Sequence, residues 1–421
     1  MIIKSLILDR NAAAILPELK KRSEGNCAVI VTPGEEARTI FSAMIDKQLV
    51  KKQDATAEMN EAIAWFNSLG AGENAEINEG IDRLRHYLVE SMPFRFSGNS
   101  LQDYIFAELS VLCAKFVAAV MGADSCQDGR NLMICDDSAS VVDAKAAAAA
   151  IQASRFEGLT VLSGGYGRTL SGYSVSLGRG GAELTATTLA SVLHPECIEF
   201  LTEQNGIQGI PELEYNEAAT LLSGEDSPIF PLALLPATRE DIPIRVCNIN
   251  DLDAPGTMVT RKGGDGAPGI TGLTSDAKLE LITVYGAGLL GSVGLSSTLF
   301  NALASAGVNV RFISQATAEF SISFAVNSSD SAKAIEAISG MVKGKTDADV
   351  LYASKAVAAV SVCGNRMRSV PGISGKVFTA LGNAGVSIVA ASQGGEELTI
   401  SVIVDAKDAE TAVAALRPLV G

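Results

Sequence analysis

The last third of the chain repeats itself, and this repeat limits the possible folds more than any other feature. One copy reads LELITVYGAGLLGSVGLSSTLFNALASAGVNVRFISQATAEFSISFAV, and the other reads VAAVSVCGNRMRSVPGISGKVFTALGNAGVSIVAASQGGEELTISVIV. Each has a strand, a Gly-rich loop, a helix ending Phe-x-Ala-Leu, an Ala-Gly-Val turn, a strand ending Ser-Gln and another alternating strand. Phe300 corresponds to Phe378, and helices at 331–338 and 409–416 follow the copies. Self-similarity over this length predicts one βαββα unit, present twice.

The Gly-rich loop of each copy leads from a strand into a helix. Backbone N–H groups at such a helix start can bind a carboxylate. A polar residue on an adjacent strand, such as Asn309 or Gln315, can fix an α-amino group or a polar side chain. The alternative is that the glycines only allow tight turns and that the copies only dimerise.

The front of the chain has a βαβ rhythm. Apolar runs at residues 1–8 and 26–31 flank a helical stretch at residues 12–22, which predicts a parallel sheet. Residues 101–121 form a strongly apolar helix that we expect to be buried. A Gly-rich loop at residues 177–183 opens a helix at residues 184–193.

Composition excludes several classes of protein. The net charge is −15 with no basic stretch, which argues against nucleic-acid binding. The 7 cysteines include no CxxC pair, and the 2 histidines, His86 and His194, exclude a His-rich metal site. Asp9 comes too early for a signal peptide, and no apolar run is expected to span a bilayer. We therefore expect a cytoplasmic protein without a metal site, a nucleic-acid partner or a membrane partner.

The two repeats resemble the ACT domains of aspartokinases. The family pattern combines a Gly-x-Gly loop, Phe-x-x-Leu, Gly-Ile-Asn-Val and Ile-Ser-Gln followed by Glu-x-Ser-Ile-Ser. The first copy matches it at Gly286, Gly288, Gly291, Gly294, Phe300, Leu303, Gly307, Asn309, Ile313, Ser314, Gln315, Glu319, Ser321 and Ser323. The second matches at Gly364, Met367, Gly372, Phe378, Leu381, Gly385, Gln393, Glu397 and Ser401.

Residues 1–262 resemble the amino-acid-kinase domain of the same family. The strongest stretch is SLGRGGAELTA at residues 176–186, against a family Thr-Leu-Gly-Arg-Gly-Gly-Ser-Asp-x-Thr-Ala. Residues 211–219, 242–248 and 254–257 complete the match. The resemblance implies a three-layer α/β/α domain at 1–262, a linker at 263–276, and two ferredoxin-like βαββαβ ACT modules at 277–345 and 355–421.

The family transfers phosphate from ATP to the side-chain carboxylate of L-aspartate, giving 4-phospho-L-aspartate. The resemblance assigns catalytic roles to Lys4, Arg179 and Glu183, substrate contacts to Gly98, Asn99, Gly178, Gly180 and Gly181, and nucleotide contacts to Thr202, Glu203 and Asn205. ATP and Mg²⁺ are the implied cofactors if the protein is active, and none is implied otherwise. The alternatives are a strand-edge role for Lys4, solvated acids at Glu183 and Glu203, and a purely structural Gly loop.

Most of the family's catalytic motifs are altered in this chain. Lys-Phe-Gly-Gly-Thr-Ser reads KSLILD at residues 4–9, so the glycines that admit a phosphate are missing. Ser-Phe-Gly-Glu reads FSGN at 96–99, and Gly-Gly-Ser-Asp reads GGAE at 180–183. Thr-Asp-Val-Asp-Gly reads TEQNG at 202–206, without the nucleotide-contacting segment that follows it in the family. Gly-Ala-Lys-Val-Leu-His-Pro reads EDSPIFP at 225–231, without its lysine.

The resemblance assigns effector binding to Gly288, Leu289, Gly291, Gly294, Asn309, Gln315, Glu319 and Gln393. The effector implied is lysine, threonine or methionine. Binding is favoured at the first copy, because Ser387 of the second stands where the family has Asn. Paired ACT modules imply a homodimer or a larger assembly, and association with an active paralogue is a further option.

Three hypotheses follow from these motifs. In the first, the kinase domain is weak or inactive, and the protein acts as an ACT-based amino-acid sensor. In the second, it is an active aspartate kinase with a rebuilt ATP site and feedback regulation. In the third, Asn99 in place of Glu reflects a kinase for another amino-acid carboxylate.

Overall fold

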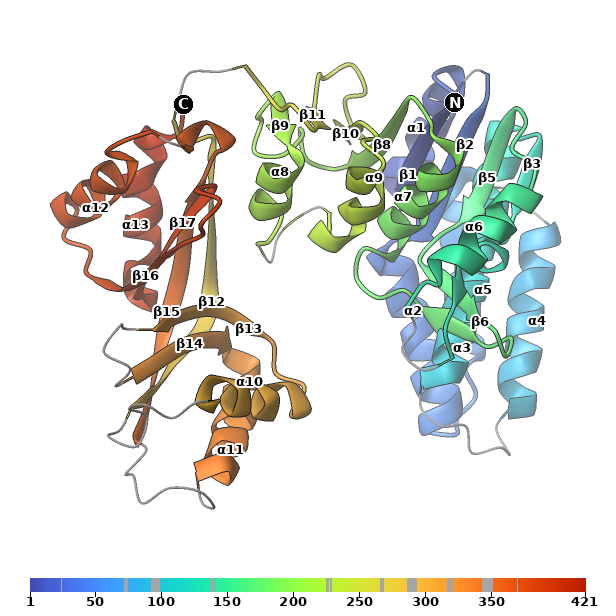
Figure 1. Cartoon of the computed structure of the whole chain (residues 1–421). Coiled ribbons are helices and arrows are strands. Elements are labelled where there is room, and N and C mark those ends of the chain that lie inside the picture. Colours follow the sequence, from blue (N-terminus) through green and yellow to red (C-terminus); the bar gives the residue numbers. More distant parts are fainter. Residues whose placement is uncertain are drawn as a thin grey trace. The chain divides into compact units, whose positions relative to one another are not determined.

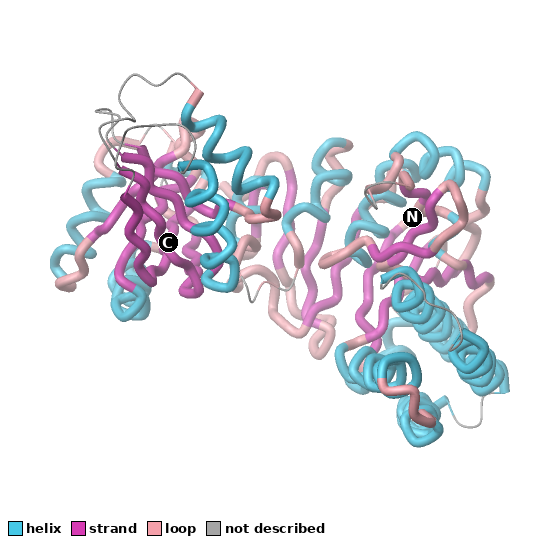
Figure 2. The backbone as a smooth tube through the Cα atoms, turned by 90° about the horizontal axis from the view of Figure 1, so that it is seen from below, coloured by secondary structure: helices cyan, strands magenta, loops and turns pink. Residues whose placement is uncertain are grey.

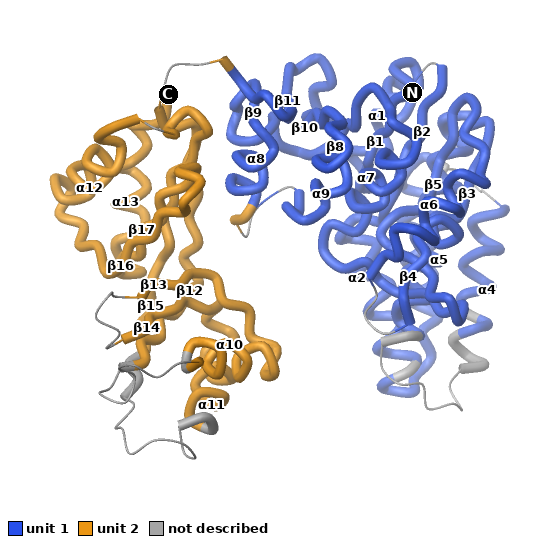
Figure 3. The backbone as a smooth tube through the Cα atoms, viewed as in Figure 1, with its two compact units in different colours: residues 1–222, 227–264 blue, residues 223–226, 265–421 orange. Residues whose placement is uncertain are grey.

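The computed structural model divides the chain into two compact units (Figures 1 and 3). It describes residues 1–421 except 24, 72–74, 92–98, 138–140, 225, 226, 228, 266–268, 286–293, 316–320, 343–350 and 369. Unit 1 consists of Met1–Leu222 and Ser227–Gly264, and unit 2 of Ser223–Asp226 and Asp265–Gly421.

Unit 1 is built on an eight-stranded sheet in the order β3-β5-β2-β1-β8-β10-β11-β9. Its strands are β1 (Ile2–Leu8), β2 (Cys27–Pro33), β3 (Ser125–Gln127), β5 (Leu159–Ser163), β8 (Cys197–Thr202), β9 (Glu212–Glu214), β10 (Ile244–Asn248) and β11 (Thr257–Thr260). The six strands from β3 to β10 are parallel, and β11 runs antiparallel to β10. The predicted parallel sheet is therefore confirmed.

A three-stranded sheet stands beside the main one. It consists of β4 (Ile134–Cys135), β6 (Tyr166–Thr169) and β7 (Ser174–Ser176). The β6–β7 hairpin follows the end of β5 and leads directly into the Gly-rich loop at residues 177–183. The hairpin therefore fixes where that loop begins.

Helices lie on both sides of the main sheet, as Figure 2 shows. They are α1 (Arg10–Lys21), α2 (Glu35–Ile45), α3 (Thr56–Phe66), α4 (Ala75–Ser91), α5 (Asn99–Met121), α6 (Ala144–Ala153), α7 (Gly181–Leu193), α8 (Tyr215–Leu221) and α9 (Leu235–Arg239). One continuous core contains side chains of α1 to α5 and one face of β1, β2 and β5. On the other face, α7 packs on β1, β2 and β8, with α6 and α9 beside it. This is the expected three-layer α/β/α arrangement.

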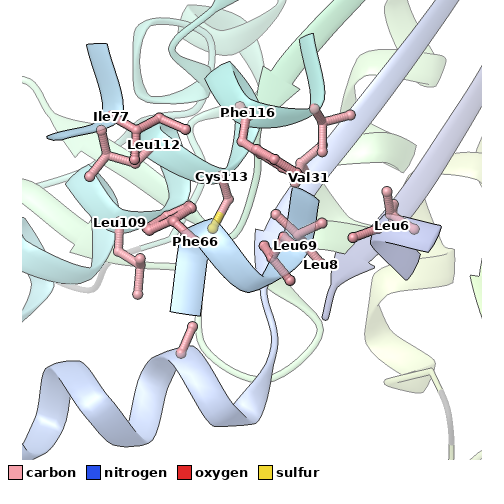
Figure 4. Packing of buried hydrophobic residues seen from close by; sticks show 14 of the residues in the cluster. Leu6, Leu8, Val31, Phe66, Leu69, Ile77, Leu109, Leu112, Cys113 and Phe116 are labelled. Atoms are coloured by element: carbon pink, nitrogen blue, oxygen red, sulfur yellow. The ribbon is translucent and has the colours of Figure 1, made fainter. Parts of the chain in front are cut away.

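The apolar pattern of α5 accounts for its position. Its buried side chains include Leu109, Cys113 and Phe116, which point into the core with Val31 of β2 (Figure 4). Residues 101–121 form a helix that is long and apolar enough to cross a membrane. The expectation that no apolar run of this chain could span a bilayer is therefore wrong for this helix. However, 67% of the most apolar 18-residue segment within it is buried inside unit 1. The core accounts for its composition.

Unit 2 contains a six-stranded sheet in the order β13-β14-β12-β15-β17-β16. Its strands are β12 (Gly272–Tyr285), β13 (Val310–Gln315), β14 (Ser321–Asn327), β15 (Leu351–Cys363), β16 (Ile388–Gln393) and β17 (Thr399–Asp405). Its helices are α10 (Leu295–Ser305), α11 (Ser331–Val342), α12 (Ile373–Asn383) and α13 (Ala409–Leu416). Each half has the order βαββα, as the repeat predicts.

The predicted linker at residues 263–276 is wrong for its last five residues. Residues 272–276 form the first part of β12 and pair with residues 359–363 of β15. The second part of β12, residues 279–285, pairs with both β14 and the first part of β15. Each module thus takes its fourth strand from the other module's long central strand. The reason is that both central strands are long enough to serve two modules.

The two halves of unit 2 contain an equivalent side-chain hydrogen bond at the same position. Thr283 and Ser323 share a side-chain hydrogen bond of 2.9 Å, and Ser361 and Ser401 share the equivalent bond of 2.7 Å. Each half has its own helix-covered core, and a third apolar cluster on the opposite face draws on strands of both. The predicted ACT-like fold of the C-terminal part is therefore confirmed.

Candidate functional site

The carboxyl ends of four parallel strands meet at one edge of the unit 1 sheet, here called the carboxyl edge. These strands are β1, β2, β5 and β8, which end at Leu8, Pro33, Ser163 and Thr202. In open α/β sheets, ligands bind outside the carboxyl ends of the strands. The residues predicted for catalysis can therefore be judged by their position relative to this edge.

The predicted Gly loop lies at the carboxyl edge. Gly178 and Gly180 have φ values of +75° and +76°, which other residues adopt only with strain. A side chain at Gly181 would place its Cβ 3.0 Å from the Cα and the carbonyl oxygen of Gly165, just beyond β5. The loop therefore lets the start of α7 approach the end of β5 without intervening side chains.

The start of α7 is electropositive. Its N-cap, Gly180, provides no side-chain hydrogen bond, so the first backbone N–H groups of the helix have no side-chain acceptor from their own cap. Arg179 is exposed, and its guanidinium lies 5.8 Å from the centre of the Phe230 ring. Together these groups favour an anionic ligand.

Glu183 lies in the first turn of α7 and is half-buried. Burial raises the pKa of its carboxyl, and the nearby charge of Arg38 opposes that increase. Arg38 belongs to α2, where its guanidinium donates to the carbonyl oxygen of Pro33 at 3.1 Å and to Thr32 Oγ1 at 3.4 Å. Sequence reasoning missed Arg38, because nothing in α2 alone marks it.

Asp103 of α5 is a second carboxyl group beside the Gly loop, and sequence reasoning missed it as well. Burial raises its pKa, and a hydrogen bond with the main chain of Ser176 opposes the increase. The charge of Asp103 also raises the pKa of the Tyr166 phenol, after the larger effect of burial. The available signal was its spacing, since Asp103 lies one helical turn after Asn99.

The structure places Lys4 away from the carboxyl edge. Lys4 lies four residues before the end of β1, about 13 Å from it at 3.3 Å per residue. Its side chain is only 4% exposed and forms an ion pair with Glu199 of β8, whose other oxygen lies 3.4 Å from Arg245. Lys4 and the Gly loop are therefore not brought together.

The predicted nucleotide contacts lie in a tight turn after β8. Glu203 and Asn205 are exposed, whereas Thr202 Oγ1 donates to the carbonyl oxygens of Gln204 and Cys247. Gly206 has a φ of +72°, and a Cβ there would lie 2.3 Å from Thr257 Oγ1. The turn is closed against the start of β11.

The residues at the end of β1 do not fit the phosphates of ATP–Mg²⁺. Leu8 is buried there, and the Asp9 carboxylate caps α1 by accepting from the N–H of Ala12 at 2.7 Å. A carboxylate in this position repels phosphate, and no glycine opens the backbone. Within the described residues, no cluster of three or more His, Cys, Asp or Glu could hold a metal ion.

The substrate motif is only partly described. Gly98 lies outside the described residues, and Asn99 is the first residue of α5. Whether either contacts a ligand therefore stays a prediction.

The second ACT-like module contains a pocket of about 470 Å³ at the predicted effector position. It is lined by Met367, Val370, Pro371, Gly372, Ile373, Ser374, Gly375, Gln393, Glu397 and Ile400. Gly372, which lines this pocket, precedes α12 with a φ of +90° and provides no side-chain cap for the helix. Ser374 Oγ donates to Gln393 Oε1 at 3.3 Å. The Gly loop, a polar strand end and an acid thus share one pocket.

The corresponding site in the first module is only partly described. Gly288, Leu289, Gly291 and Glu319 lie outside the described residues. Gly294 is the N-cap of α10 with a φ of +90°, which matches Gly372, and Asn309 and Gln315 are exposed. Effector binding by the residues of the first module therefore stays a prediction.

Comparisons with known proteins agree with this division of the chain. The model of the amino acid kinase family matches residues 5–248, and the ACT domain model matches residues 282–340 and 360–418. A bifunctional aspartokinase/homoserine dehydrogenase of Haemophilus influenzae is 31% identical over 58% of this chain and 32% of its own length. The chloroplastic bifunctional enzyme 1 of Arabidopsis thaliana is 26% identical over 82% of this chain and 41% of its own. The chain thus spans well under half the length of these relatives.

Solved structures show the same fold over the whole chain. The aspartate kinase of Clostridium acetobutylicum has a TM-score of 0.81 at 18% identity, with 100% of both chains covered. Aspartokinase III of E. coli, in complex with aspartate and ADP, has a TM-score of 0.79 at 21% identity, with 99% of both covered. Identities this low establish the fold and leave the chemistry to the residues of the site.

Proposed function

We propose that this chain, a member of the aspartokinase family, has a regulatory role in the pathway of aspartate-derived amino acids. The chain belongs to that family because it combines an amino acid kinase domain with two ACT domains. In this proposal the ACT modules bind an amino-acid effector, and the kinase domain transfers phosphate from ATP to L-aspartate weakly or not at all. The site of action is the cytoplasm.

The position of Lys4 carries the proposal. Phosphoryl transfer needs cations to neutralise the phosphates and backbone amides to hold them. The lysine that the family motif would supply is buried against Glu199, and Leu8 and Asp9 stand where phosphates would need open backbone. Arg38 and Arg179 lie near the carboxyl edge, but Arg38 donates to the carbonyl oxygen of Pro33 and to Thr32 Oγ1, and neither residue replaces a phosphate-binding loop.

The pocket of the second ACT module supports effector binding. An α-amino acid needs a donor set for its carboxylate and an acceptor for its ammonium group. The start of α12 offers backbone N–H groups, and Gln393 and Glu397 offer oxygens in the same cavity. Lysine, threonine and methionine are the proposed candidates. The E. coli enzyme of similar fold was solved in complex with lysine and aspartate.

An active aspartate kinase is the second candidate function. The observation in its favour is the close packing of Gly181 on Gly165, which keeps the start of α7 open to an anion at the carboxyl edge. A kinase for another amino-acid carboxylate is a further candidate, because Asn99 stands where the family motif has Glu. Both would require ATP–Mg²⁺ to bind where the described residues offer no phosphate-binding loop.

Effector binding gives the first prediction. The full chain is expected to gain thermal stability with one of lysine, threonine or methionine, because a ligand that binds the native state stabilises it. Gln393→Ala is expected to reduce that shift by removing the amide from the pocket. Val389→Ala on the same strand, which is exposed and does not line the pocket, is the matched control. No shift with any of the three amino acids would contradict the sensing proposal.

We further propose a homodimer or a larger assembly through the ACT modules, with an active aspartokinase paralogue as an additional partner. β13 and β16 are the edge strands of the six-stranded sheet, and several of their side chains are exposed. Edge strands with unpaired backbone groups are suited to pairing with another copy.

A further inference from the structure

A pocket of about 440 Å³ lies in unit 1, between the first half of α5, residues 128–131 and the β6–β7 hairpin. Pockets for small organic ligands begin at about 300 Å³, so this one is large enough to hold such a ligand. Among the described residues, its lining includes none that the family resemblance assigns to catalysis, to the substrate or to the nucleotide. The pocket, here called the hairpin pocket, is therefore a candidate site separate from the Gly loop.

One wall of the hairpin pocket is built around Arg130. Its Nη2 donates to Glu108 Oε1 and to Asp128 Oδ2, each at 2.6 Å, and its Nη1 donates to Ser174 Oγ at 3.1 Å. Its guanidinium also lies 5.9 Å from the centre of the Tyr104 ring. These contacts hold Arg130 in place, and the two carboxylates exceed its charge by one. This side of the pocket therefore favours a hydrogen-bond donor of a ligand and not an anion.

The opposite requirement holds at the hairpin. Arg168 of β6 lines the pocket, is exposed and has no ion pair with any described residue. It lies directly opposite Ser174 of β7, so the two side chains are neighbours on one face of the hairpin. Because Ser174 Oγ accepts from Arg130, its own O–H can donate into the pocket. A cation beside a hydroxyl donor suits the carboxylate or phosphate of a ligand.

Aromatic side chains form the remaining walls. The ring centres of Tyr87 and Tyr104 are 4.6 Å apart, and Tyr173 at the end of the hairpin lines the pocket while 65% exposed. Such faces stack on a planar ring of a ligand. Glu108 uses one carboxylate oxygen for Arg130, and its other oxygen accepts no hydrogen bond from a described residue. That oxygen can accept from an N–H group of the stacked ring.

The geometry points to the hairpin pocket as a binding site for a ligand that joins a planar aromatic ring with an N–H donor to an anionic group. The ring lies against Tyr104 and Tyr173, and the anion contacts Arg168 and Ser174. Nucleotides with a phosphate and aromatic carboxylates both have this chemistry. The inference goes beyond the proposed function, because it needs neither phosphoryl transfer nor effector binding at the ACT modules. The alternative is that Arg168 and Tyr173 are only surface residues of a hairpin that fixes the start of the Gly loop.

The test is calorimetric titration of the full chain with two pairs of probes. AMP and adenosine differ by a phosphate, and indole-3-acetate and indole-3-acetamide differ by the charge of a carboxylate, so the two pairs distinguish the sources of the anion. At least one anionic probe is expected to bind about tenfold or more tightly than its uncharged counterpart, because it gains a charge-assisted hydrogen bond. Arg168→Gln is expected to remove that difference. Tyr173→Ala is expected to weaken both members of the pair about fivefold, because the ring loses a stacking face.

Arg155→Gln is the matched control, since Arg155 is an exposed arginine of unit 1 that does not line the pocket, and it is expected to change no affinity. The inference is overturned if neither anionic probe binds, or if the uncharged probes bind as tightly as the anionic ones. It is also overturned if Arg168→Gln or Tyr173→Ala leaves binding unaltered, because the probe then binds elsewhere. The response to lysine, threonine and methionine is recorded in parallel. That response reports on the ACT modules, so failure of effector sensing and failure of this inference are distinguishable.

Discussion

Lys4→Met is expected to lower the free energy of unfolding of unit 1 by about 3 kcal/mol. Lys4 and Glu199 are 4% and 15% exposed in their side chains, so the variant leaves a buried carboxylate without its partner. Arg245, 3.4 Å away, compensates in part, which keeps the expected loss below that of a fully isolated charge. Denaturant unfolding followed by circular dichroism measures the change.

Two further variants separate this ion pair from general effects of charge. The double variant Lys4→Met/Glu199→Met is expected to recover most of the lost stability, because replacing both members of a buried pair is close to neutral. Lys21→Met removes a lysine that is 74% exposed and paired with Glu18, and it is expected to cost less than about 0.5 kcal/mol. If Lys4→Met leaves the free energy of unfolding unchanged, the ion pair with Glu199 does not hold Lys4 in place. The catalytic assignment of Lys4 would then stand again.

Phe116→Ala is expected to lower the free energy of unfolding by about 4 kcal/mol. Phe116 is 1% exposed, and its ring centre lies 6.5 Å from that of Phe66. Its removal would leave a cavity between α5, α3 and the sheet, in the region drawn in Figure 4. The same denaturant titration applies, with the full chain in the absence of ligands.

Val120→Ala is the matched control for Phe116→Ala. Val120 lies one turn later on α5 and is 36% exposed, so its truncation is expected to cost less than about 1 kcal/mol. The pair tests whether α5 is a core helix of unit 1. Equal and small effects of both variants would show that the apolar face of α5 is not packed in this core, and its length and composition would then call for a different explanation.

The fold of unit 2 could be predicted because its sequence contains two copies of the same pattern, which can be compared with each other. Each copy shows the same order of strand, loop and helix, and comparing the copies removes much of the ambiguity of a single pattern. The exchange of fourth strands could not be predicted. It depends on residues 272–276 pairing with residues 359–363, and no local pattern specifies a partner so far away in the chain.

The candidate site was predictable where the motif is local. The loop at Gly178–Gly181 lies where the sequence pattern indicated, because a Gly-rich loop before a helix specifies its own geometry, although α7 begins at Gly181 and not at residue 184 as predicted. Lys4 was assigned by its order in a motif, whereas its environment depends on the register between β1 and β8, which brings Glu199 beside it from 195 residues away. Asp103 carried a weak local signal, its spacing from Asn99.

The most direct test of the account is equilibrium titration of the full chain with ATP–Mg²⁺, with L-aspartate present, and separately with lysine, threonine and methionine. The account predicts stabilisation by one of the three effectors, no stabilisation by ATP–Mg²⁺ and at most weak transfer of phosphate to aspartate. Saturable binding of ATP–Mg²⁺ with formation of the aspartyl phosphate would contradict it and establish an active kinase with a rebuilt site.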